Sequence, residues 1–150
     1  MDNSKTIDAL NNLLQITNDR IKGFEMVEKK VIGTNNDLKV QYEMAVTAAY
    51  GMRSELSSLI RGKGGDENNT STVAGGLHRT WIEVKNSLLG DREESTLENV
   101  TFGEKASIEA YEKALESGDL DENSTTEVKY QLEKIRESYL QFSSLEKSED

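Results

Sequence analysis

Four stretches of this sequence repeat apolar residues every three or four positions, and they are joined by links of very unequal length. This spacing places the apolar side chains on one face of an α-helix. The first and third links are short enough for antiparallel helical hairpins, whereas the middle link is several times longer. The predicted helices are at about 5–32, 36–61, 92–117 and 124–145, with the long link at 62–91.

The long link narrows the choice of fold. Its first half is rich in glycine and asparagine and predicts a loop, while its second half predicts a short helix at about 76–89. A link that travels the length of a bundle makes the third helix run parallel to the second. We therefore predict one all-α domain, 1–150, with the connectivity of a ferritin-like four-helix bundle whose long crossover contains a short helix. The absence of proline agrees with long helices.

Charge and composition exclude several classes of function. The formal net charge is −10, and no stripe of Lys and Arg offers a face for nucleic acid or for an anionic membrane. Without cysteine, the chain has no disulfide, thiol nucleophile or iron–sulfur ligand. The N-terminal sequence lacks the apolar run of a signal peptide, so we expect a soluble, cytoplasmic protein. The acidic balance favours cations or basic proteins as partners.

One carboxylate, Glu104, falls on the apolar face of the third predicted helix. Three interpretations are open: a buried ion pair or hydrogen-bond network, a helix-edge residue that reaches water, or a metal ligand or acid–base group. Counting ~1.5 Å of rise per residue places Glu104 level with Arg20 on the first helix and Lys134 on the fourth. These cations favour the ion pair, and the neighbouring Gly103 allows the helices to approach closely.

The metal interpretation lacks its usual ligands. Di-iron members of the ferritin-like group use two Glu-x-x-His pairs, but the pairs that begin at Glu104 and Glu133 end here in Ser and Arg. Glu28 also lies on an apolar face, but it sits ~12 Å from Glu104 along the bundle, too far to share an ion. The main interpretation therefore predicts no cofactor. Its alternative is an unorthodox iron or manganese site built from Glu104, Glu28 and His78.

The crossover contains the only histidine and the only tryptophan of the chain. Trp81 lies on a short apolar face and is expected to anchor the crossover to the bundle. His78 either makes a structural hydrogen bond beside Arg79 or acts as a metal ligand or proton shuttle. With one histidine and no cysteine, no nucleophile–base pair can be recognised, so no catalytic residue is predicted.

The tyrosines and methionines are expected to pack rather than to react. On the predicted core faces lie Tyr42, Tyr111 and Tyr139. Core or near-core packing is also the prediction for Met26, Met44 and Met52.

Two stretches, "GGLHRTWIEVKNSLLG" and "LENVTFGEKASIEAYEKAL", resemble an uncharacterised family of bacterial ferritin-like four-helix-bundle proteins, a domain of unknown function. The family pattern is a Gly-x-His-Arg-x-Trp crossover followed by a Gly–Glu pair in the third helix. The matching positions are Gly76, His78, Arg79, Trp81, Gly103 and Glu104, and the first helix adds Gly23 and Phe24. The resemblance implies the fold and a bacterial origin, and it implies no activity.

The functional prediction follows from these features. We expect a non-enzymatic bundle that works through binding or assembly, with a stress-related role and a homodimer as further expectations. A small ligand or protein partner would use a groove beside the crossover. The alternative is a metal-binding storage protein or a metal-dependent oxidoreductase.

Overall fold

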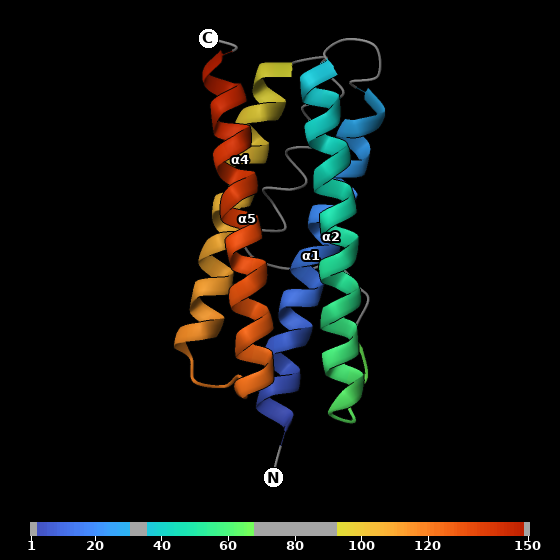
Figure 1. Cartoon of the computed structure of the whole chain (residues 1–150), viewed down its shortest axis with the longest axis vertical. Helices are drawn as coiled ribbons and strands as arrows, with labels where there is room; N and C mark the ends of the chain where they lie inside the picture. Colours follow the sequence, from blue (N-terminus) through green and yellow to red (C-terminus); the bar gives the residue numbers. More distant parts are fainter. Residues whose placement is uncertain (1–2, 31–35, 68–92, 149–150) are drawn as a thin grey trace.

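The computed structural model of the chain describes residues 3–30, 36–67 and 93–148. Four long α-helices lie side by side along the long axis of the molecule (Figure 1). Their bounds are α1 Ser4–Lys30, α2 Asn36–Gly62, α4 Glu93–Glu116 and α5 Glu122–Ser148. The prediction of an all-α four-helix bundle is confirmed. None of the helices in the described ranges is long and apolar enough to cross a membrane.

The bundle consists of two helical pairs. Helix α1 packs along α2, and α4 packs along α5; the pairs meet where α2 contacts α5 and where α1 contacts α4. In Figure 1, α1 and α5 run in one direction and α2 and α4 in the other. Helices α2 and α4 are therefore parallel, as a link that travels the length of the bundle requires. The short helix expected at 76–89 lies outside the described residues.

The fourth helix differs most from its prediction, which placed it at 124–145. It begins at Glu122 because the Asp121 carboxylate accepts a hydrogen bond from the backbone N–H of Ser124 at 3.0 Å and caps the first turn. It continues to Ser148, beyond its predicted end at 145. The preceding helix ends where Gly118 adopts a φ of 77°, a left-handed conformation that favours glycine.

The core is divided into two apolar clusters along the bundle. The aromatic cluster lies around Phe24, whose ring stacks on Phe142 at 5.7 Å between centroids. Its buried members are Phe24, Val27, Leu38, Tyr42, Ala45, Leu97, Val100 and Phe142. The aliphatic cluster occupies the other half and consists of Leu10, Leu13, Leu14, Ile16, Met52, Leu56, Ile60, Tyr111, Val128, Leu132 and Ile135. Residues from all four helices contribute to both clusters.

Two of the packing predictions need correction. Met44 was expected in or near the core, but its side chain is 55% exposed. It follows the buried Tyr42 by two residues, and two residues turn a helix by roughly 200°, so Met44 points outward. Tyr139 is half-buried rather than in the core. Tyr42, Tyr111 and Met52 are buried as predicted, and Met26 is half-buried against the aromatic cluster.

Candidate functional site

A layer of polar side chains lies at the centre of the bundle. Its main contact is a forked ion pair between Arg20 of α1 and Glu104 of α4. Arg20 Nε donates to Glu104 Oε1 at 2.7 Å, and Arg20 Nη2 donates to Glu104 Oε2 at 2.9 Å. The two side chains are 2% and 0% exposed. The carboxylate is therefore deeply buried, which contradicts the helix-edge interpretation and agrees with the ion pair.

Groups from the other helices complete the surroundings of this pair. The Ser138 hydroxyl of α5 donates to Glu104 Oε2 at 2.7 Å. The Arg20 guanidinium also donates to Met52 Sδ of α2 at 3.6 Å and lies 5.3 Å from the Phe24 ring centroid. Burial lowers the pKa of Arg20, but the negative charge and hydrogen bonds of Glu104 outweigh it and raise the pKa. Arg20 therefore stays charged.

A second set of buried hydrogen bonds lies next to the ion pair. The Tyr111 hydroxyl of α4 donates to Gln131 Oε1 of α5 at 2.7 Å and lies 3.4 Å from the Thr17 hydroxyl of α1. Gln131 Nε2 in turn donates to the backbone carbonyl of Met52 in α2 at 3.2 Å. Burial raises the pKa of Tyr111 to about 12. The tyrosine therefore remains a neutral donor across the physiological pH range.

Small residues make room for this layer. Ala49 of α2, three residues before Met52, is fully buried. Gly103 is buried, and its carbonyl accepts a hydrogen bond from the Ser107 hydroxyl at 2.9 Å. Ser107 occupies the position where a Glu-x-x-His pair would place its histidine. At this level the bundle thus contains small and hydroxyl side chains in place of imidazole.

The residues around Glu104 do not fit a divalent cation. Both carboxylate oxygens accept hydrogen bonds from Arg20, and a guanidinium at this distance would repel a metal ion. Within the described ranges, no group of three or more His, Asp or Glu side chains could hold a metal. Glu28 lies in α1, but its side chain is outside the described set. The alternative metal site therefore gains no support from Glu104.

The other candidate residues from the sequence are Lys134 and those of the crossover. Lys134, placed level with Glu104 by the residue count, forms an ion pair with Glu137 of its own helix at 3.8 Å. The crossover residues Gly76, His78, Arg79 and Trp81 lie outside the described residues, so their expected roles stay predictions.

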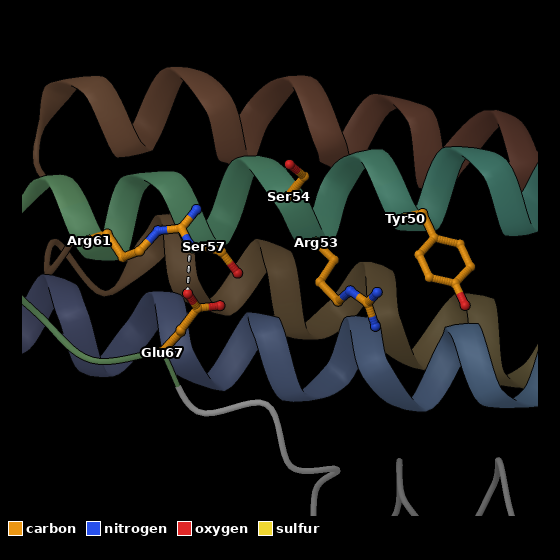
Figure 2. Close-up of a pocket in the computed structure, with 6 residues that line it drawn as sticks. All are labelled: Tyr50, Arg53, Ser54, Ser57, Arg61 and Glu67. Carbon is orange, nitrogen blue, oxygen red and sulfur yellow. Dashed lines mark hydrogen bonds and ion pairs between the residues drawn. The ribbon is translucent and has the colours of Figure 1, made fainter.

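A second polar region lies outside the core, in an open groove of ≈ 550 Å³ on the outer face of α2. Figure 2 shows its lining residues, Tyr50, Arg53, Ser54, Ser57, Arg61 and Glu67. Arg53 stacks over the Tyr50 ring at 4.6 Å, and Arg61 pairs with Glu67 at 2.9 Å. Helix α1 borders the groove, because Arg53 Nη1 donates to Asn18 Oδ1 at 3.5 Å and the Tyr50 hydroxyl donates to Glu25 at 3.0 Å.

Two sets of residues in these sites were not predicted from the sequence, although their spacing places each set on one face of a helix. Gln131 lies three residues after Val128 and four before Ile135, and therefore on the core face of the fourth helix. Arg53, Ser57 and Arg61 repeat every four residues, which places them on one face of α2. Both sets are polar, and a search for apolar periodicity does not select them.

Comparison with known protein families gives a match over most of the chain. Residues 5–117 match the model of a family described as a domain of unknown function (DUF2383), which covers well over half of the 150 residues. Neither a search of curated proteins nor a search of solved structures finds a match.

Proposed function

We propose that the chain, which belongs to the DUF2383 family of domains of unknown function, works as a non-enzymatic ferritin-like bundle that acts through binding or assembly. The observation that carries this proposal is the forked contact between Arg20 and Glu104. In a di-iron bundle the central carboxylates bind metal, whereas here the central carboxylate is neutralised by a fixed guanidinium. The protein's own cation takes the place that a metal ion would need.

The ferritin-like part of the proposal rests on connectivity and direction. Two antiparallel pairs are joined by one long link, and α2 runs parallel to α4 (Figure 1). The binding part rests on the groove beside the start of the crossover, where cationic and hydroxyl side chains face solvent. The proposal keeps the expected stress-related role, which predicts that the level of the protein rises under stress.

Metal analysis of the purified protein tests the proposal. Protein expressed with added iron and manganese is expected to contain far less than one metal ion per chain, because Arg20 competes for Glu104. Glu104→Ala and Glu28→Ala serve as matched variants, with helicity measured by circular dichroism to show that each still folds. Stoichiometric metal in the wild type that is lost in both variants would overturn the proposal and establish the metal alternative.

Assembly is tested separately by sedimentation velocity. The proposed homodimer predicts a species of twice the 16.8 kDa chain mass that dissociates on dilution. A mass of 16.8 kDa at every concentration would contradict the homodimer and leave binding as the remaining mode.

A further inference from the structure

The groove on α2 contains a regular series of polar side chains. Arg53, Ser57 and Arg61 are spaced by four residues, so each lies ~6 Å further along the helix than the one before. In Figure 2 the Ser57 hydroxyl lies between the Arg53 and Arg61 side chains. Arg61 extends toward Ser57, whereas the Arg53 guanidinium lies over the Tyr50 ring (Figure 2). A change of the Arg53 rotamer would let both guanidinium groups reach a single anion beside the serine.

Arg53 differs from the other arginines whose side chains the structure describes. Arg20, Arg61 and Arg136 each form an ion pair with a carboxylate. Among the described residues, Arg53 has no carboxylate within ion-pair distance; its contacts are the Tyr50 ring and one long hydrogen bond to Asn18. A guanidinium has five N–H donors, so most of those of Arg53 are available. In a chain with a net charge of −10, a cation without a carboxylate partner is notable.

Ser57 supplies a second, independent observation. Only 6% of the residue is exposed, and it lines the groove. Within the described part of the chain, its hydroxyl makes no hydrogen bond, so it can donate to a group that enters the groove. A bound group with acceptor oxygens would satisfy the Ser57 hydroxyl from the groove.

Arg61 can be released for such a ligand at low cost. Its side chain is 61% exposed, and its contact with Glu67 at 2.9 Å is a surface ion pair. Exposed ion pairs contribute little stability because water can replace either partner. An anion with more charge than one carboxylate would compete well with Glu67 for this guanidinium.

We propose that the groove binds the phosphate group of a small phosphorylated ligand between Arg53, Ser57 and Arg61. A tetrahedral phosphate has three acceptor oxygens at its end, which matches two guanidinium forks and one hydroxyl. A carboxylate carries only one charge, so it would attract the two guanidinium groups less strongly than a phosphate does. The inference deepens the proposed binding function and rests on it.

Titration with inorganic phosphate tests this site. Isothermal titration calorimetry, at constant ionic strength, is expected to show saturable binding of one phosphate per chain. Arg53→Gln is expected to weaken binding by about tenfold, because a charge-assisted hydrogen bond is lost. Ser57→Ala is expected to weaken it by about threefold, as for a neutral hydrogen bond. Glu67→Gln is expected to strengthen binding, since it frees Arg61.

The matched control is Arg136→Gln on α5, which removes an equal charge from an arginine outside the groove. It is expected to leave phosphate binding unchanged. The site would be overturned by no saturable binding in the wild type, or by equal weakening in Arg53→Gln and Arg136→Gln. Tighter binding of malate than of phosphate would overturn the ligand class. Because metal content is measured separately, a failed phosphate titration does not change the outcome of the metal test.

Discussion

Helix α4 presents a glutamate to an arginine at two places, one inside the bundle and one on its surface. Glu104 accepts from Arg20 of α1, and Glu112 accepts from Arg136 of α5 at 3.0 Å. The chemistry of the two pairs is the same, but their exposure is not. The side chains of the inner pair are 2% and 0% exposed, and those of the outer pair are 41% and 42% exposed.

This difference in exposure determines how much each pair contributes to the stability of the fold. At the surface, water replaces a lost partner, so an ion pair contributes little to stability. In the interior, water cannot replace a lost partner, so each buried charge depends on the other for its stabilisation. The inner pair therefore fixes the register of α1 against α4, whereas the outer pair can open and close without consequence for the core. Both pairs hold helices together, but only the inner one selects a single arrangement.

The largest expected effect is the loss of the inner carboxylate. Glu104→Ala leaves the Arg20 cation buried without its partner and should lower the free energy of unfolding by ~3–5 kcal/mol. The matched variant Glu112→Ala should change it far less, because Arg136 is accessible to water and keeps its contact with Glu133. Urea denaturation followed by circular dichroism measures both. Similar losses in the two variants would contradict the distinction between the pairs.

Replacing both residues of the inner pair separates the effect of charge from the effect of packing. Arg20→Met with Glu104→Leu removes both charges and keeps a similar volume, so its stability should be close to that of wild type or up to ~4 kcal/mol higher. The coupling energy in the double-mutant cycle should then be close to the sum of the costs of Arg20→Met and Glu104→Leu made singly. The control cycle uses Arg136→Met and Glu112→Leu and should show little coupling. A double variant as unstable as Glu104→Ala would mean that packing, and not charge, sets the cost.

Much of this layer follows from residue counting. The apolar spacing of α4 points Glu104 inward, and the rise per residue places it level with Arg20. These two steps give Arg20 and Lys134 as candidate partners, because helices in a bundle are nearly parallel and axial distance is proportional to residue number. The four helices could be predicted because each has a long apolar face.

Other features of the layer and the groove could not be predicted from residue counts. They depend on the rotation of each helix about its own axis and on contacts between polar groups. The residue count places Lys134 level with Arg20, but Lys134 points to solvent and pairs with Glu137. The start of α5 depends on a cap by Asp121, which apolar periodicity does not detect. Gln131 reaches the carbonyl of Met52 only because α5 packs against α2. The groove is defined by side chains that carry no apolar signal at all.

A smaller effect is expected from the tyrosine beside the ion pair. Tyr111→Phe removes the donor to Gln131 Oε1 and leaves a buried acceptor without its partner, which should cost ~1–3 kcal/mol. Because burial raises the pKa of Tyr111 to about 12, its absorbance should titrate only in strongly alkaline solution. A spectrophotometric titration of wild type against Tyr111→Phe isolates this group. A difference that titrates near pH 10 would show that the hydroxyl reaches water.

The smallest expected effect belongs to the contact at the end of the bundle between Lys63, which follows α2, and Asp121, which precedes α5. Burial opposes ionisation of Asp121, but hydrogen bonds from Lys63 and Ser124 outweigh it and lower its pKa from 3.8 to about 2. A carboxylate with a lowered folded-state pKa stabilises the fold above its unfolded pKa, and the contribution disappears as the pH falls through about 2.

Asp121→Asn keeps an oxygen to cap α5 and removes the charge. Because the Asp121 side chain is 38% exposed, screening by solvent reduces the loss at pH 6 to less than about 1 kcal/mol. The difference from wild type should shrink between pH 4 and pH 2, where wild-type Asp121 also becomes neutral, and it should shrink in 1 M salt. Thermal melts across this range provide the measurement. A difference that persists unchanged at pH 2 would assign the loss to the cap, and the contrast between buried and exposed charge would then rest on the two glutamates of α4.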